Sequence, residues 1–219
     1  MRPFVFGSKN KTDILDLTKT APLLEAALAY VRGLAANGKT MLIVGGKPEM
    51  RDLVRKTAVD ISMPYVAGRW LGGTLTNYAE IKKRIKLMVE LTTDRDAGSL
   101  AKKYTKKERL MIDREIARLE ERFTGLVTLD KLPHAVLVVD SRHESIAVLE
   151  AHELSIPVIG IMNTDCDVST VTYPIVGNDA SRESVAYFLN AISDAYREGL
   201  KGHVAPPSSE VPVASTVVT

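Results

Sequence analysis

The stretch Ala135-Val136-Leu137-Val138-Val139-Asp140 decides the fold class of this chain. Its apolar residues run without a polar interruption, which is typical of a parallel strand that is covered on both faces. The segments Met41-Leu42-Ile43-Val44 and Pro157-Val158-Ile159-Gly160-Ile161 have the same character. We therefore expect a parallel sheet whose two faces are both buried.

Amphipathic helical patterns separate these strands on both sides. Strands that alternate with helices of this length imply right-handed crossovers and helices on both faces of a parallel sheet. The sequence thus predicts an α/β fold with a doubly wound, flavodoxin-like parallel sheet. The expected helices cover 20–37, the segment between Pro48 and Pro64, 147–154 and 185–199, and further short strands are expected at 64–66 and 173–176.

An insertion interrupts this alternation. Apolar residues repeat at spacings of four and three within 78–91 and again within 106–123, with a polar stretch at 92–99 between them. Two narrow apolar seams favour a projecting antiparallel hairpin with coiled-coil-like packing over two helices lying on the sheet. The expected organisation is a sheet domain formed by 1–77 and 126–202, an inserted basic helical hairpin at 78–125, and a disordered tail at 203–219.

The formal net charge of +2 conceals a strong asymmetry along the chain. Residues 1–125 contain 24 Lys and Arg against 15 Asp and Glu, whereas residues 126–219 contain 5 against 12. Such asymmetry indicates either that one part of the molecule meets a polyanion or that the surface is mixed and solvated. Charge alone does not separate these two interpretations.

The basic insertion supports the first of them, because lysine and arginine clusters neutralise phosphates and release counterions. Next to it, Arg69-Trp70 offers two planar groups that can stack on an exposed base, although core packing explains the tryptophan equally well. Together with positions in the motif and the N-terminal strip, these clusters define the candidate RNA-binding residues. They are Lys9, Lys11, Arg69, Trp70, Asn77, Lys82, Lys83, Arg84, Lys102, Lys103, Lys106 and Lys107.

No catalytic pattern stands out. The turn Gly45-Gly46-Lys47 lacks both the third glycine of a dinucleotide fingerprint and the Walker spacing, and a tight strand-to-helix turn explains its glycines without a ligand. Cys166 has no histidine near it in sequence, and the four histidines show no metal-ligand spacing. We expect a non-catalytic protein. An enzyme that binds phosphate at this turn and a regulatory protein that docks through the hairpin stay as alternatives.

Acidic residues gather where the later strands should end. Asp140, Asp165, Asp167 and Asp179 could hold a hard cation such as Mg²⁺ through oxygen ligands. Asp and Asn also cap helices and shape turns, and this is the favoured interpretation. We expect no cofactor, and a strand-end Mg²⁺ or Zn²⁺ ion stays as the less favoured alternative.

The compartment is indicated by what the sequence lacks. A single cysteine cannot form an internal disulfide, no apolar run approaches the roughly 20 residues of a membrane-spanning helix, and the first residues carry no secretory signal pattern. We expect a soluble, cytoplasmic chain that binds no membrane and forms no homo-oligomer.

The run Arg69-Trp70-Leu71-Gly72-Gly73-Thr74-Leu75-Thr76-Asn77, followed by the basic hairpin, resembles the bacterial-type family of small-subunit ribosomal protein two. The likeness extends over roughly residues 2–200, through Phe4-Val5-Phe6-Gly7, Leu132-Pro133-His134-Ala135 and Tyr173-Pro174-Ile175. The resemblance implies a doubly wound domain with an inserted coiled coil, in a bacterial or organellar small ribosomal subunit. It also implies contacts with ribosomal RNA, with neighbouring ribosomal proteins and with the large mRNA-binding ribosomal protein one.

Three departures from the family pattern bear on these expectations. The family usually has a further N-terminal segment, with an aromatic-Gly-His and a Trp-Asn-Pro motif, before the equivalent of Arg2-Pro3-Phe4. Its frequent Asp-Thr-Asn reads Asn163-Thr164-Asp165 here, which weakens a metal role for that loop. Its frequent double acid after Gly-Asn reads Asp179-Ala180.

Overall fold

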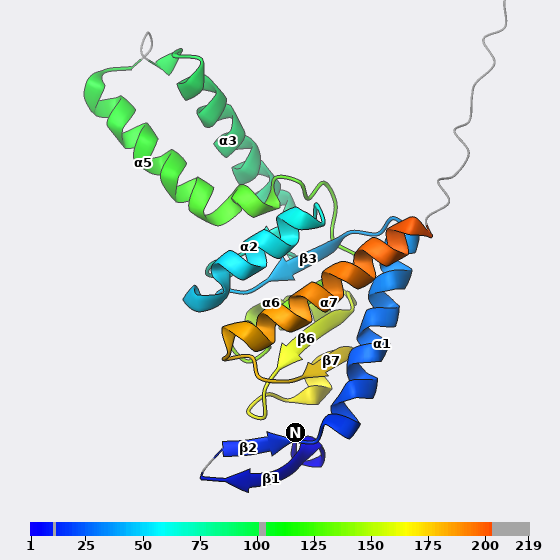
Figure 1. Cartoon of the computed structure of the whole chain (residues 1–219). Coiled ribbons are helices and arrows are strands. Elements are labelled where there is room, and N and C mark those ends of the chain that lie inside the picture. Colours follow the sequence, from blue (N-terminus) through cyan, green and yellow to red (C-terminus); the bar gives the residue numbers. More distant parts are fainter. Residues whose placement is uncertain (11, 101–103, 203–219) are drawn as a thin grey trace, which may run out of the picture.

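Five short parallel strands form the central sheet of the protein, whose computed structural model describes residues 1–10, 12–100 and 104–202 (Figure 1). The strand order is β4-β3-β5-β6-β7, so the second strand in sequence lies outside the first and the later strands follow on the other side. This is the flavodoxin-like order, and the predicted fold class is confirmed. The strands are β3 (Met41–Val44), β4 (Tyr65–Val66), β5 (Ala135–Val139), β6 (Val158–Met162) and β7 (Tyr173–Val176).

Both faces of the sheet are buried, as the unbroken apolar runs predict. Every residue of β3, β5 and β6 is buried. Because side chains alternate along a strand, Ile43, Leu137 and Ile159 belong to one apolar cluster, whereas Leu42 and Val136 belong to another. The sheet therefore separates two cores.

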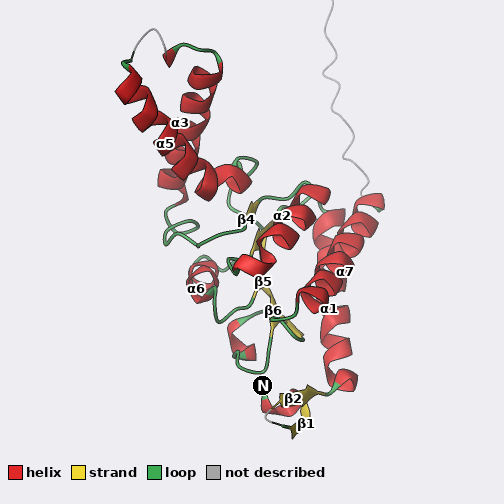
Figure 2. Cartoon of the chain, turned by 60° about the vertical axis from the view of Figure 1, so that its left-hand side comes forward, coloured by secondary structure: helices red, strands yellow, loops and turns green. Residues whose placement is uncertain are grey.

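Different helices cover the two faces (Figure 2). The helices α1 (Leu17–Ala36), α2 (Arg51–Asp60) and α7 (Arg182–Lys201) pack on the first core. The shorter helix α6 (Ser145–Glu153) packs on the second. A single turn, η2 (Pro48–Met50), precedes α2, and its proline occupies a first-turn position where the missing N–H has no cost.

The insertion forms the predicted pair of long helices, α3 (Tyr78–Asp96) and α5 (Lys106–Phe123), which project from the sheet in both views (Figures 1 and 2). Their buried residues face each other across the hairpin, and the residues near its base join the second core. A further turn, η3 (Thr124–Leu126), returns the chain toward the sheet. The buried seam residues are Ile81, Ile85, Met88, Ile116, Leu119 and Phe123.

The structure corrects the end of the first hairpin helix. Residues 92–96 were expected in a polar loop, but α3 continues through them to Asp96. Polar residues alone do not break a helix, and the hydroxyl of Thr93 donates to the carbonyl oxygen of Val89 one turn earlier. The helix ends only before Gly98, whose φ of +69° favours glycine.

A small antiparallel hairpin at the N-terminus was not predicted. The turn η1 (Arg2–Phe4) leads into β1 (Val5–Lys9), which pairs with β2 (Thr12–Leu15) at the opposite end of the molecule from α3 and α5 (Figure 1). A further turn, η4 (Val168–Thr170), precedes β7. The tail expected at 203–219 lies outside the described residues. None of the helices within the described ranges combines the length and apolar character of a membrane span.

Candidate nucleic-acid interface

The cations of α3 lie on the outside of the hairpin. Lys82, Lys83 and Arg84 are exposed and lie between the buried seam positions Ile81 and Ile85. Two of them have protein partners: the ammonium of Lys83 lies 3.1 Å from the Glu80 carboxylate, and that of Lys82 donates to the carbonyl oxygen of Asp130 at 3.0 Å. The first half of the hairpin is therefore basic but partly neutralised.

The cations at the start of α5 lie on a helical turn that a capping box stabilises. Thr105 caps this helix: its hydroxyl accepts from the N–H of Glu108, whose side chain bonds back to Thr105, and these bonds lower the pKa of Glu108. Lys106 and Lys107 occupy the first helical positions and are exposed. Their charges add to the positive end of the helix dipole. The candidates Lys11, Lys102 and Lys103 lie outside the described residues.

A buried carboxylate organises the motif that precedes the hairpin. Glu150 of α6 accepts hydrogen bonds from the indole N–H of Trp70 at 3.0 Å and from the backbone N–H groups of Gly73, Leu75 and Thr76 at 2.8, 2.9 and 3.2 Å. Burial raises the pKa of Glu150, but these bonds lower it more, so its pKa lies below the ordinary value. The loop is therefore held around one ionised side chain.

This contact corrects the interpretation of Trp70 as a base-stacking residue. Trp70 is only 6% exposed and packs in the second core, so the folded chain offers no ring face to a nucleotide. Its neighbour Arg69 is exposed, as is Asn77, the residue before α3, and so is Lys9 at the end of β1. Core packing, the alternative interpretation, explains the tryptophan.

Glu150 itself was not singled out by sequence, although a signal existed. The helical spacing of Ala147, Ala151 and Leu154 places Glu150 on the same face as these apolar residues. A carboxylate within an apolar stripe requires several donors, since an unpaired buried charge is too costly. What the sequence lacked was the identity of those donors, which lie more than 70 positions earlier in the chain.

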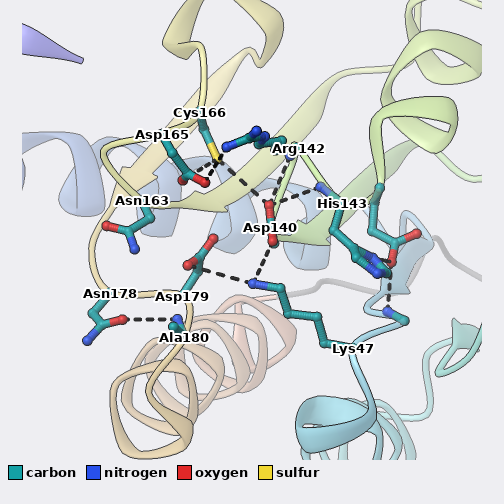
Figure 3. Close-up of polar contacts among 12 residues, drawn as sticks. Lys47, Asp140, Arg142, His143, Asn163, Asp165, Cys166, Asn178, Asp179 and Ala180 are labelled. Atoms are coloured by element: carbon teal, nitrogen blue, oxygen red, sulfur yellow. Dashed lines mark hydrogen bonds and ion pairs between the residues drawn. The ribbon is translucent and has the colours of Figure 1, made fainter.

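The carboxyl ends of the strands hold a second polar cluster (Figure 3). The ammonium of Lys47, after β3, lies 2.5 Å from a carboxylate oxygen of Asp140 and 3.8 Å from one of Asp179. Burial raises the pKa of Asp140, but Lys47 and two backbone N–H groups lower it by more, so the pKa lies below its ordinary value. Burial and the neighbouring Asp140 raise the pKa of Asp179.

Turn and cap contacts hold two of the four acids at these strand ends, Asp140 and Asp167. Asp140 accepts from the N–H groups of Arg142 and His143, each at 3.0 Å. Asp167 caps η4 through the N–H of Ser169. Asp165 forms an ion pair with Arg142 at 2.9 Å. Asp179 differs, because one of its buried oxygens has no hydrogen-bond partner among the described residues.

A divalent cation would find three donors close together in this cluster. One oxygen each from Asp140 and Asp179 and the sulfur of Cys166 lie within 4.8 Å of one another. The ammonium of Lys47 already supplies positive charge between the two carboxylates. Burial raises the pKa of the Cys166 thiol, which disfavours the thiolate that a metal needs.

Packing explains the glycine turn without a ligand. A Cβ on Gly46 would lie 2.6 Å from a carboxylate oxygen of Glu144 and 2.8 Å from the carbonyl oxygen of Gly68. The N–H of Gly46 donates to that same Glu144 oxygen at 2.8 Å. A phosphate at this turn would have to compete with a buried carboxylate for the N–H group.

Comparison with protein families identifies one model that spans nearly the whole described structure. The family model described as "Ribosomal protein S2" matches residues 1–199. The match includes the N-terminal hairpin, the sheet and the inserted helices, and it stops just before the end of α7. It therefore covers every feature from which the resemblance was drawn.

Proposed function

The chain belongs to the ribosomal protein S2 family, a family of structural components of the small ribosomal subunit, and from this premise we propose that it binds small-subunit ribosomal RNA and neighbouring ribosomal proteins. The match runs from residue 1 to residue 199. The proposal thus concerns the sheet domain and the inserted hairpin together. It makes the protein an assembly component whose work is to hold RNA and protein segments in place.

The observation that carries the RNA part is the separation of charge from apolar surface on the hairpin. Its seam residues are buried, whereas Lys82, Lys83, Arg84, Lys106 and Lys107 all point away from the seam and are exposed. Exposed lysines and arginines contact phosphates without reading sequence, and such contacts fix position and orientation. A projecting, rigid pair of helices can therefore reach RNA at a distance from the sheet.

The N-terminal hairpin supports the protein-binding part. Phe6 is 78% exposed, Leu17 is 72% exposed and Ile14 is 47% exposed, and all three lie in or directly after the β1–β2 pair. Large apolar side chains exposed on one small hairpin are candidates for a protein contact. We propose that this end of the molecule faces a neighbouring ribosomal protein, with the large mRNA-binding ribosomal protein one among the partners to be tested.

The internal contacts of the strand-end cluster support a non-catalytic role. Lys47 is shared between Asp140 and Asp179, and the N–H of Gly46 bonds to Glu144. These groups lie at the edge where parallel α/β sheets bind their ligands, and they are engaged with one another. The proposed function needs no cofactor.

Cofractionation tests the proposal directly. A tagged chain expressed in its own cells should sediment with the small subunit on a sucrose gradient and should leave that fraction when ribonuclease is added. A chain that stays in the slow, soluble fractions at all salt concentrations would contradict the proposal. A map of the small subunit that contains the chain would then show which RNA helices and which proteins it touches.

A further inference from the structure

A groove lies where the base of the hairpin meets the sheet domain. Two adjoining hollows of about 460 and 440 Å³ share four lining residues: Arg51, Arg69, Trp70 and Ile146. Residues 65–72, which run from β4 into the motif that begins at Arg69, line the larger hollow. The groove opens over the carboxyl ends of β3, β4 and β5, where parallel α/β folds bind their ligands.

Four arginines line this groove, and they come from three separate parts of the chain. Arg51 and Arg55 belong to α2, Arg69 follows β4, and Arg122 lies in the last turn of α5. All four are exposed. Among the described residues, none of the four guanidinium groups forms an ion pair or a hydrogen bond with the protein.

The lysines of α3 differ in this respect. Lys83 pairs with Glu80 and Lys86 with Glu90, and Lys82 donates to a backbone carbonyl. Those cations are already partly satisfied, whereas the guanidinium groups of the groove keep all their donors for a ligand. Surface pairs of this kind are weak, but they still lower the potential that an incoming anion meets.

The acids of the groove do not cancel its charge. Glu120 and Glu121 line the side formed by α5, and Glu120 lies 3.7 Å from Arg95, a cation outside the groove. Glu144 is buried and engaged with the N–H of Gly46 and with the ring of His143. The arginines of the groove therefore outnumber the carboxylates that are available to pair with them.

We propose that this arginine groove binds the sugar–phosphate backbone of ribosomal RNA, an inference that rests on the proposed function and gives it a defined site. Guanidinium groups bind phosphate oxygens through two parallel hydrogen bonds and so fix its orientation as well as its position. Arg51 and Arg55 of α2, Arg122 of α5 and Arg69 of the loop after β4 supply these groups, and Arg51 and Arg69 line both hollows. The exposed side chain of Ile146, at the junction of the two hollows, offers an apolar contact to a ribose or base.

The test uses the full chain and small subunits washed at high salt to remove the endogenous copy. The double variant Arg55→Glu/Arg122→Glu should bind these subunits at least tenfold more weakly than the unaltered chain, and the salt dependence of binding should fall by about two counterions, roughly one for each lost phosphate contact. The milder Arg55→Gln/Arg122→Gln should change binding in the same direction, with unchanged circular dichroism. The matched control is Lys39→Glu/Lys201→Glu, which reverses two exposed lysines away from the groove.

A photoactivatable amino acid at position 146 identifies the ligand, and it should crosslink to RNA. If the groove variant binds as tightly as the control, the proposal that the groove binds RNA is overturned, while the ribosomal role stays intact. Crosslinking to a protein alone would also overturn it, because the groove would then hold an acidic protein segment. Failure of the unaltered chain to bind the washed subunits would end both the groove and the proposed function.

Discussion

Glu150 accepts a hydrogen bond from the indole N–H of Trp70 at 3.0 Å, although the two residues lie 80 positions apart in sequence. The same carboxylate accepts backbone N–H groups of Gly73, Leu75 and Thr76. This contact joins α6 to the loop that carries Arg69 and leads into α3. One buried side chain therefore helps to position the hairpin and the loop that lines the arginine groove.

Replacement of Glu150 by alanine should destabilise the fold strongly. It would leave the indole and three backbone donors without their acceptor, and each buried donor that loses a partner costs about 1–3 kcal/mol, with water satisfying some of them. We expect a loss of about 2–4 kcal/mol in the free energy of unfolding by urea. Glu153→Ala, an exposed position on the same helix, is the control and should change stability little. Equal effects of the two changes would show that the loop is held by other contacts.

The stability of the chain should depend on pH through the same residue. The folded pKa of Glu150 lies below its ordinary value of 4.5, so the stability that Glu150 contributes is present above the unfolded pKa and is lost as pH falls through the folded pKa. Urea titrations between neutral pH and pH 3 should therefore show that the unaltered chain loses stability more steeply than Glu150→Gln does below about pH 4.5. Parallel curves for the two proteins would contradict this assignment.

The sheet was predictable because its strands are apolar on both faces. Runs such as 135–139 admit few alternatives, and the helical hairpin followed from two seams with a spacing of four and three. The β1–β2 pair escaped prediction because its residues are mostly exposed, so no face is marked by buried side chains. The last turn of α3 also escaped prediction, because polar residues fit a loop and an exposed helix equally well.

The site was less accessible to sequence than the fold. Clusters such as Lys82-Lys83-Arg84 are visible as neighbours in the chain, which is why the hairpin drew the first interpretation. The arginines of the groove are separated in sequence, and each is an ordinary surface residue until the fold brings α2 and α5 together. Trp70 was ambiguous because its partner, Glu150, becomes adjacent only through the packing of α6.

Replacement of Asp179 by asparagine should stabilise the chain at neutral pH. Burial and the nearby Asp140 raise the pKa of Asp179, so its charged form is unfavourable, and one of its oxygens has no hydrogen-bond partner in the part of the chain that the structure describes. When folding raises the pKa of a carboxyl group, that group lowers the stability of the fold. This destabilisation is absent below the unfolded pKa and grows as pH rises to and beyond the folded pKa. The gain in stability, on the order of 1 kcal/mol at pH 7, should vanish below the ordinary carboxyl pKa of 3.8. Asp165→Asn, which alters an exposed ion pair, is the control, and a loss of stability in Asp179→Asn at pH 7 would show that its weak contact with Lys47 outweighs the burial penalty.

Charge reversal on the hairpin separates its contribution from that of the groove. Lys82, Lys83, Lys106 and Lys107 lie off the buried seam, so their change to glutamate should leave the helices folded and the thermal midpoint within a few degrees. Incorporation into small subunits should still fall, because four phosphate contacts are lost and four repulsive charges are added. The matching change to glutamine should reduce incorporation less, since it removes attraction without adding repulsion.

Because Lys82 and Lys83 already have protein partners, reversal of the two groove arginines should have the larger effect per residue. The opposite order, measured by competition between labelled variants for the same subunits, would place the main RNA contact on the hairpin and leave the groove a secondary one.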